Sequence, residues 1–291
     1  MTPQGFPTDF QEIASWATDH RVAIDDARRR FAQYGILRAI AASRRLRSTI
    51  VLKGGNAIDF IWHPNRSTLD LDFSAEASVR PEDRPERWIA TALQQALDAS
   101  TALLGTTYRV QRLRRQPPGE DKTFVSLNAN VAYALQDEGR LRQRIRAGEP
   151  LSRIIPIEIS LNEVLCDVVS IQLDDRNVLR ICSIEDIIAE KLRALLQQVT
   201  RNRVRSQDLL DIVVLLRDHP VRASAVSSFL LQKAEARHVS VSRSSFRDPE
   251  VQRRAGQDYA ALKSTVRYSF IEFDEALRDL FTFVDSLDIP D

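Results

Sequence analysis

The chain alternates between two spacings of hydrophobic residues. Apolar side chains recur every three or four positions over 8–47, 56–62 and 82–104, which predicts helices. Shorter segments alternate apolar and polar side chains or form brief apolar runs, which predicts strands at 49–52, 66–73, 123–131, 153–160 and 178–182. The polar, arginine-rich stretch 136–150 between two of these strands predicts an exposed loop or hairpin.

Beyond residue 182 only the helical spacing remains. Ser183 and Asp186 have the spacing of a capping box at a helix start, and an apolar stripe follows over 184–196. Further helices are expected at 209–216, 221–236 and 256–287. We therefore expect an α+β fold in two domains. Residues 1–182 would form a small mixed sheet with flanking helices, and residues 183–291 would be entirely helical.

The composition is that of a globular chain, with 43% hydrophobic and 28% charged residues and a formal net charge of +1. This near-neutral sum excludes a polybasic protein that holds nucleic acid by bulk charge, although a local basic face is still allowed. No apolar run approaches the roughly 20 residues of a membrane span. The two cysteines are isolated, so we expect a cytoplasmic protein without disulfides that does not enter a membrane.

Two aspartates share one face of the strand expected at 66–73. Asp70 and Asp72 are two positions apart, so their carboxylates point the same way while their apolar neighbours face the core. Like charges this close are costly unless a cation compensates them, and a rigid pair of oxygen ligands suits metal-dependent nucleotidyl transfer. Gly54-Gly55, ahead of the pair, offers backbone N–H groups to a phosphate. The alternatives are the solvated face of an ordinary sheet and a tight turn.

Lysine is scarce, because only five of the 41 basic residues are lysines. Lys53 directly precedes the two glycines, and Lys191 lies on the polar side of the helix expected at 184–196. Asp208 stands at the start of the next helix, a position that acidic residues also favour for the helix dipole alone.

Four segments taken in order resemble one protein family. They are KGG at 53–55, RSTLDLDF at 66–73, EKLRAL at 190–195 and RSQDLLD at 205–211. Over roughly residues 34–216 the chain resembles the AbiEii/AbiGii nucleotidyltransferase-like toxins of bacterial abortive-infection and toxin–antitoxin systems. The resemblance implies the DNA polymerase β-like nucleotidyltransferase fold and Mg²⁺-dependent transfer of NMP from an NTP to an RNA. In some relatives the acceptor is the 3′ end of tRNA, and the transfer blocks translation; a cognate antitoxin is an expected partner.

The resemblance also assigns roles to single residues. Asp70 and Asp72 would hold the metal. Lys191 would stabilise charge on the triphosphate, and Asp208 would either fix Lys191 or help take the acceptor proton. Gln207 departs from the family, in which a lysine or arginine is common, so no phosphate role is expected for it. The residues expected near the nucleotide are Gly54, Gly55, Arg66 and Thr68.

No motif fixes a third metal carboxylate. Glu158 is the candidate because it faces away from the apolar side of its strand. The neighbouring Pro156 favours an edge strand, which would make Glu158 an ordinary exposed glutamate.

Arginine clusters are the candidates for binding RNA, and each is equally consistent with a solvated surface. They lie at 28–30 with 44, 45 and 47, at 109, 112, 114 and 115, and at 140, 142, 144 and 146. Two other functions fit the same carboxylates. One is a small-molecule nucleotidyltransferase of the antibiotic-modifying kind, and the other is a module that binds a nucleotide or a partner without turnover.

Overall fold

The computed structural model describes residues 5–64, 68–117, 124–267 and 269–291. Contacts between residues divide them into two compact units. The first unit comprises the described residues up to 163 together with 169–181, and the second comprises 164–168 and the described residues from 182 onward. None of the helices in the described part of the chain has both the length and the hydrophobicity that a membrane crossing needs.

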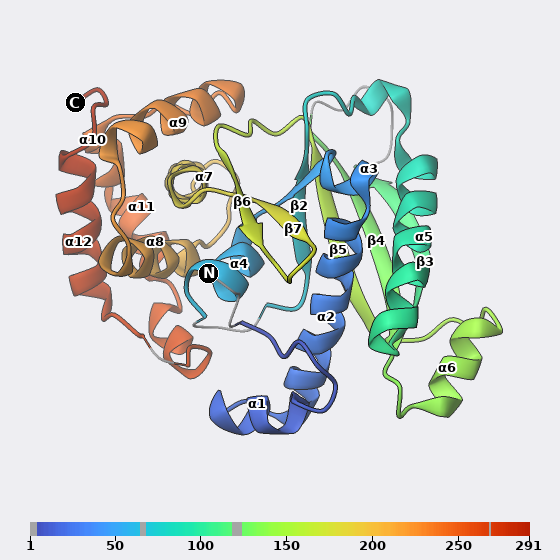
Figure 1. The fold of residues 1–291 in the computed structure, drawn as a ribbon. Helices are drawn as coiled ribbons and strands as arrows, with labels where there is room; N and C mark the ends of the chain where they lie inside the picture. Colours follow the sequence, from blue (N-terminus) through green and yellow to red (C-terminus); the bar gives the residue numbers. More distant parts are fainter. Residues whose placement is uncertain (1–4, 65–67, 118–123, 268) are drawn as a thin grey trace. The chain divides into compact units, whose positions relative to one another are not determined.

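A seven-stranded mixed sheet in the order β3-β4-β5-β2-β1-β7-β6 forms the centre of the first unit (Figure 1). β2 runs antiparallel to β1 and parallel to β5, β1 runs parallel to β7, and β4 runs antiparallel to both of its neighbours. The strands are β1 Ile50–Leu52, β2 Leu71–Ala75, β3 Thr107–Gln116, β4 Val125–Ala134, β5 Ile154–Leu161, β6 Val168–Gln172 and β7 Val178–Cys182. The helices of this unit are α1 Ile13–Asp19, α2 Ile24–Ala42, α3 Arg44–Arg47, α4 Gly54–Ala57, η1 Ile58–Trp62, η2 Pro81–Asp83, α5 Glu86–Leu104 and α6 Gly139–Arg146.

The two faces of the sheet differ in polarity. Every second side chain along β4 and β5 is buried on the face that α2 and α5 cover. On that face Tyr108 of β3 donates a hydrogen bond to the carbonyl of Ala32 in α2 (2.9 Å), and Arg115 of β3 pairs with Glu86 of α5 (2.8 Å). The intervening side chains form the opposite surface, here named the open face. Across β2, β5, β4 and β3 it carries Asp72, Glu158, Asn128 and Arg114.

Residues 136–150 contain a helix and not the expected loop. In α6, Leu141 and Ile145 lie one turn apart and pack against Ala132 and Ala134 of β4. Four arginines at alternate positions obscured this short apolar stripe in the sequence.

Three strands also differ from the prediction. β3 and β6 were not expected, and the apolar alternation of β3 is broken by a bulge between Val110 and Arg112. β2 starts at Leu71, later than the predicted residue 66. The side-chain amide of Gln33 donates to the carbonyls of Thr68 and Leu69 (both 3.2 Å), which holds these residues outside the strand ladder. Leu69 is therefore 58% exposed, although the alternation predicted it to be buried.

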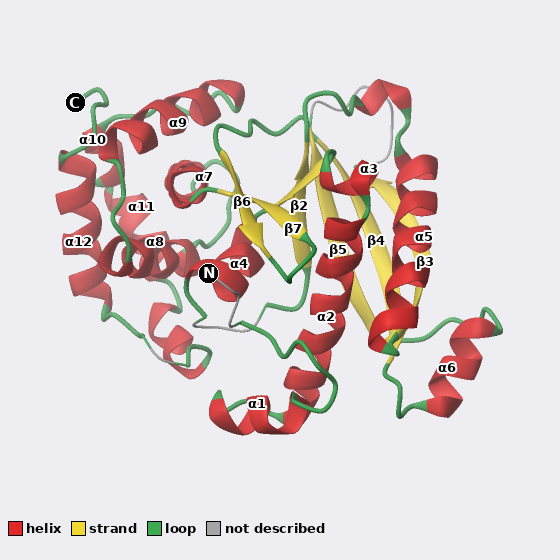
Figure 2. Cartoon of the chain, viewed as in Figure 1, coloured by secondary structure: helices red, strands yellow, loops and turns green. Residues whose placement is uncertain are grey.

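The second unit is helical, as Figure 2 shows for α7 to α12. Ser183 caps α7 by accepting a hydrogen bond from the N–H of Asp186 (3.1 Å), as the spacing predicts. The Asp186 carboxylate accepts from the N–H of Cys166 (2.8 Å) and pairs with the buried Lys233 (3.1 Å). The helices are α7 Ile184–Gln197, α8 Ser206–Asp218, α9 Ala223–Ala236, α10 Arg243–Phe246, α11 Pro249–Gly256, η3 Tyr259–Ser264 and α12 Phe273–Asp285. The predicted α+β class, with helices flanking a mixed sheet, is confirmed.

Candidate active site

Three of the predicted carboxylates lie on, or directly before, two neighbouring strands of the sheet. Asp72 of β2 stands directly opposite Glu158 of β5, so both side chains lie on the open face. Asp70 immediately precedes β2 and is exposed. β5 lies between β4 and β2 in the strand order, so the prediction of an edge strand from Pro156 is wrong. Pro156 pairs with Asn130 of β4, whereas pairing with β2 begins one residue later, at Ile157.

Lys53 lies within a polar cluster that the sequence did not predict. Its Nζ donates to Ser160 Oγ (2.9 Å) and forms an ion pair with Glu163. Ser74 of β2 donates to the same carboxylate, and it stands opposite Ser160 in the sheet. The backbone N–H of Lys53 also donates to the carbonyl of Asp72 (2.9 Å). The cluster therefore fixes the end of β1 beside the acidic residues.

The negative charge of Asp72 is incompletely compensated. Burial raises the pKa of Asp72 to about 6, and the negative charges of Asp70, Glu158 and Glu163 act in the same direction. The cation of Lys53 lowers this pKa, but not by enough to restore the ordinary value. A further cation beside Asp72 would therefore favour its ionised form.

This group of carboxylates fits a magnesium ion. Within the described residues, no three His, Cys, Asp or Glu side chains come close enough together to hold a metal ion unaided. Mg²⁺ typically binds through one or two carboxylates and completes its coordination with water and substrate phosphates. The residues that would hold such an ion are the exposed Asp70, directly before β2, and the partly buried Asp72 within it.

Gly54 brings the backbone close to the Asp72 carboxylate. Its φ of +68° lies in the left-handed region that favours glycine, and a Cβ at this position would meet Asp72 Oδ2 at 2.8 Å. Gly54 and Gly55 open α4 directly after Lys53. A side chain at Gly54 would occupy space beside the carboxylate, so the sequence requires glycine there for both conformation and access.

Thr68 and Arg66 are the other two residues expected near the nucleotide. Thr68 lies two residues before Asp70, and its buried Oγ1 has no hydrogen-bond partner within the described structure. Arg66 lies outside the described residues.

Lys191 and Asp208 meet in the second unit. The buried Nζ of Lys191, on α7, donates to Asp208 Oδ1 (2.7 Å) and to Asp211 Oδ2 (2.8 Å), both on α8. Arg205 lies 3.4 Å from the other oxygen of Asp208. Asp208 is therefore in contact with Lys191, and its part in the reaction stays a prediction. Asp211 was not singled out as a site residue, although it is the second acid of the 205–211 segment.

The structure removes part of the first arginine cluster from the candidates for binding RNA. Arg30 is buried and pairs with Asp59, and Arg28 pairs with Asp137 (2.7 Å). These arginines neutralise charges within the first unit, because a buried carboxylate such as Asp59 needs a partner. Neither presents a free cation on the surface.

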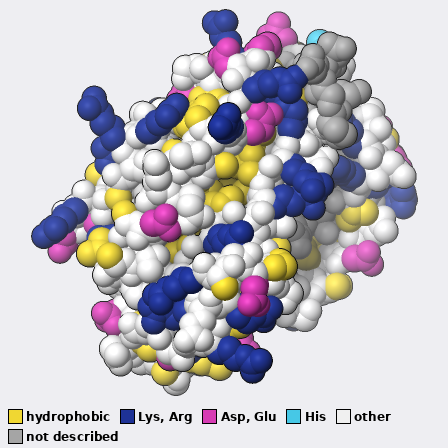
Figure 3. Space-filling model, turned by 90° about the vertical axis from the view of Figure 1, so that its right-hand side faces the viewer, with side chains coloured by type: hydrophobic (Ala, Val, Ile, Leu, Met, Phe, Trp, Pro, Cys, Tyr) yellow, Lys and Arg dark blue, Asp and Glu magenta, His cyan; other side chains and the backbone are white. Residues whose placement is uncertain are grey.

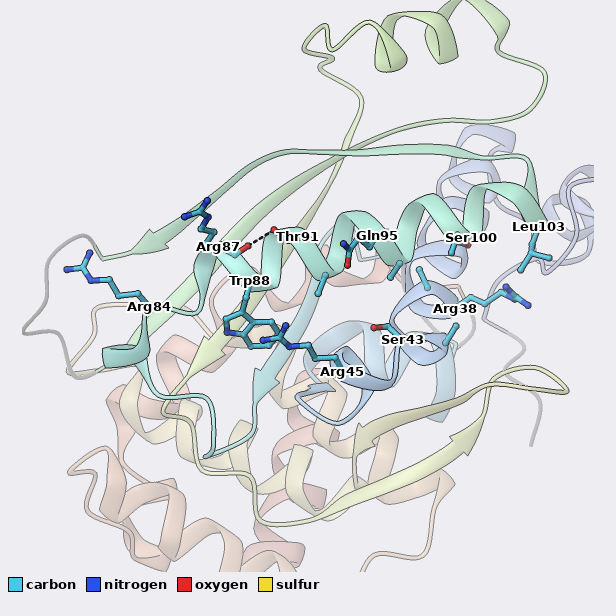
Figure 4. A pocket seen from close by; sticks show the side chains of 15 residues that line it. Arg38, Ser43, Arg45, Arg84, Arg87, Trp88, Thr91, Gln95, Ser100 and Leu103 are labelled. Atoms are coloured by element: carbon cyan, nitrogen blue, oxygen red, sulfur yellow. Dashed lines mark hydrogen bonds between the residues drawn. The ribbon is translucent and has the colours of Figure 1, made fainter.

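A groove of about 710 Å³ lies between α2, α3 and α5, away from these carboxylates. Alanines line much of it, and Arg84, Arg87 and Arg45 contribute charged side chains (Figure 4). The guanidinium of Arg45 lies 4.1 Å from the ring centre of Trp88. In Figure 3 hydrophobic surface on one side of the molecule is bordered by Lys and Arg side chains. The groove contains none of the residues predicted to bind the metal or the nucleotide, and the helices that cover the apolar face form it, so the reaction is not assigned to it.

Comparisons with known proteins identify the family. Residues 35–279 match the family described as nucleotidyl transferase AbiEii toxin, type IV toxin–antitoxin system. The chain belongs to this family. The resemblance seen in the four sequence segments is thereby confirmed, and the match extends well beyond the last of them.

Two solved structures are similar to this AbiEii chain. MenT4, a nucleotidyltransferase toxin from Mycobacterium tuberculosis, is 16% identical with a TM-score of 0.53, and the alignment covers 96% of this chain and 90% of that chain. JHP933 from Helicobacter pylori is 15% identical with a TM-score of 0.50, and 90% of this chain and 91% of that chain are covered. At these identities the likeness concerns the fold. A comparison with functionally curated proteins gives no match.

Family membership makes the AbiEii chain a nucleotidyltransferase toxin of a toxin–antitoxin system. A nucleotide substrate and an antitoxin partner follow from that membership.

Gly54→Ala should lower the rate of nucleotidyl transfer by about 10–100-fold, because the new Cβ displaces the Asp72 carboxylate. The measurement is kcat for incorporation of labelled nucleotide, with the melting temperature recorded alongside. Gly139→Ala is the matched control, since a Cβ there meets no atom within 4 Å. Equal activity of the two variants would show that the close approach of Gly54 to Asp72 has no functional role.

Proposed function

We propose that the AbiEii chain is a Mg²⁺-dependent toxin that transfers NMP from an NTP to the 3′ hydroxyl of an RNA. The proposed acceptor is the 3′ end of a tRNA in the cytoplasm, and the modified tRNA no longer supports translation. The observation that carries this proposal is the placement of Asp72, with Asp70 and Glu158 beside it, on the open face next to the backbone of Gly54.

Each candidate site residue outside the helical unit has a defined role in this proposal. Asp70 and Asp72 hold Mg²⁺, and Glu158 is the third carboxylate in reach because it is the register partner of Asp72. Gly54 and Gly55 lie against the triphosphate, and at Gly54 a Cβ would intrude on the Asp72 carboxylate. The hydroxyl of Thr68 and the guanidinium of Arg66 are assigned to the same phosphates by the family resemblance.

The transfer itself follows from positioning and charge. The acceptor oxygen forms a bond to the α-phosphorus as the bond to pyrophosphate breaks, with the two oxygens in line. When bound, Mg²⁺ neutralises charge that develops on the phosphates. Lys191 is assigned to the β- and γ-phosphates, and Asp208 is a positioning residue, because it accepts a hydrogen bond from Lys191 at 2.7 Å.

The purified protein should transfer label from at least one α-labelled NTP to RNA in a mixture of total RNA, and removal of Mg²⁺ by EDTA should stop the transfer. Asp70→Ala should reduce the rate by about 10²–10³-fold or more, the range found for other lost electrostatic stabilisers. Full activity of Asp70→Ala would refute the assignment of the metal site. Label that enters small molecules but no RNA would refute the RNA acceptor and favour the small-molecule alternative.

A further inference from the structure

A row of polar side chains crosses the open face in register with Asp72. Asp72 of β2 pairs with Glu158 of β5, Glu158 with Asn128 of β4, and Asn128 with Arg114 of β3. The four side chains therefore lie on one line perpendicular to the strands. Because neighbouring strands are spaced by about 4.8 Å, the line extends about 14 Å from the Asp72 strand to the Arg114 strand.

A second line runs beside the first. Asn130 of β4 pairs with Arg112 of β3, two residues from the first line on each strand. Arg112 and Arg114 are exposed, and Asn128 and Asn130 are partly exposed. The polar surface is thus two side chains wide where it reaches the edge of the sheet.

These side chains have unused hydrogen-bonding capacity. Within the described structure, neither arginine forms an ion pair, and the side-chain amides of Asn128 and Asn130 form no hydrogen bond. Many other arginines of the first unit are paired, as Arg115 on the opposite face of β3 is with Glu86. Asparagine is also unfavourable in strands, and β4 is an interior strand. Asn128 and Asn130 thus lower the stability of the strand, and no hydrogen bond of their side chains within the described structure offsets this cost. Such a pattern points to a ligand.

The strand order indicates which ligand this is. Gly54 follows β1, on one side of β2, whereas β5, β4 and β3 lie on the other side. In the proposed reaction the departing pyrophosphate lies toward Gly54. In-line transfer requires the attacking oxygen to approach from the opposite side of the α-phosphate, which is the side of β5. The row therefore begins where the acceptor hydroxyl must enter.

We infer that the open face of β5, β4 and β3 binds the single-stranded 3′ end of the acceptor RNA. This inference rests on the proposed function and adds the path of the substrate. Arg112 and Arg114 bind backbone phosphates upstream of the terminal nucleotide, and Asn128 and Asn130 donate to and accept from bases or 2′-hydroxyls. Toward the other end of the strands, α6 covers Ala132 and Ala134 of β4, so the path leaves the sheet over Arg112 and Arg114.

The test compares Arg112→Ala/Arg114→Ala with the wild type in two assays. The first measures KM for RNA and KM for NTP in label transfer. The second measures binding of a single-stranded oligoribonucleotide with a free 3′ hydroxyl, without NTP, over a range of salt concentrations. We expect KM for RNA and the dissociation constant of the oligonucleotide to rise at least about tenfold, with KM for NTP unchanged. Loss of two phosphate contacts should reduce the slope of log affinity against log salt by about 1.4.

The matched control is Arg80→Ala/Arg87→Ala, which removes the same charge from two exposed arginines outside the row. It should leave both KM values and the salt slope unchanged. A rise in KM for NTP alone would overturn the inference and assign the row to the nucleotide. Unchanged oligonucleotide binding in Arg112→Ala/Arg114→Ala would also overturn it. Wild-type protein that binds the oligonucleotide but transfers no label to RNA would contradict the proposed function and leave the binding surface in place.

Asn128→Ala/Asn130→Ala separates recognition from charge. This variant should raise KM for RNA while the salt slope stays that of the wild type, because no phosphate contact is lost. An unchanged KM for RNA would limit the surface to its two arginines and would overturn the role of the asparagines.

Discussion

Asp72→Asn should abolish nearly all nucleotidyl transfer and at the same time stabilise the protein at pH 8. The rate should fall by about 10²–10³-fold or more, because a carboxylate that holds the metal is replaced by a neutral amide of the same shape. The measurement is kcat for label transfer at saturating Mg²⁺. Mg²⁺ should also raise the melting temperature of the wild type and not that of the variant, since only the wild type binds it tightly.

The gain in stability follows from the raised pKa of Asp72. In the folded state this pKa is about 6, above the value of about 3.9 in an unfolded chain. Ionised Asp72 therefore destabilises the folded protein. The cost is absent below about pH 4, grows between pH 4 and 6, and is complete above pH 6, where it reaches about 3 kcal/mol. Asparagine removes this cost, so the melting temperature of Asp72→Asn should be a few degrees above that of the wild type at pH 8. At pH 4 the two melting temperatures should be equal.

Asp19→Asn, at the exposed end of α1, makes the same chemical change without these surroundings. It should alter neither kcat nor the difference in melting temperature between pH 8 and pH 4. An Asp72→Asn protein that retained wild-type kcat would contradict the assignment of Asp72. One that was inactive but less stable than the wild type at pH 8 would contradict the account of its burial.

Lys191→Met should lower the free energy of unfolding by about 3–5 kcal/mol, because it removes the buried cation that both Asp208 and Asp211 contact. Urea titration of the purified variant measures this change. Lys263→Met is the matched control. That lysine is 70% exposed and pairs with Glu272 at 3.2 Å, so its loss should cost less than about 1 kcal/mol.

A triple variant separates the structural from the catalytic role of Lys191. Lys191→Met with Asp208→Asn and Asp211→Asn also removes the two carboxylate charges that Lys191 contacts, so most of the lost stability should return. If Lys191 acts on the triphosphate, the stable triple variant still transfers no label. Wild-type activity in that variant would make Lys191 a structural residue only.

The site was predicted from the sequence where its residues are neighbours along the chain. Asp70 and Asp72 were proposed because strand alternation puts side chains two residues apart on one face, although only Asp72 lies within β2, and Gly54 was proposed because the glycine pair precedes them. Glu163 was missed because its contact with Lys53 joins residues 110 positions apart. No local pattern encodes a contact at that separation. The same holds for the register that places Glu158 beside Asp72.

The errors in the fold have similar local causes. β3 was missed because its bulge shifts the alternation by one residue between Val110 and Arg112. α6 was predicted as a loop because its helical stripe consists of only Leu141 and Ile145 among arginines. Pro156 indicated an edge strand, yet β5 tolerates it in the interior because its pairing with β2 starts at the next residue. In each case the tertiary partner, and not the propensity of the segment, decides the structure.

β3 has one more consequence, for the behaviour of the protein in solution. It stands at the end of the strand order and is ten residues long, so the backbone groups along its outer side have no neighbouring strand in the described sheet. A long exposed edge strand can pair with the same edge of a second copy and start aggregation. The exposed charges of Arg112 and Arg114 and the adjacent bulge oppose such pairing. We therefore expect the two arginines that we place on the RNA path also to disfavour pairing of two copies of the toxin along this edge.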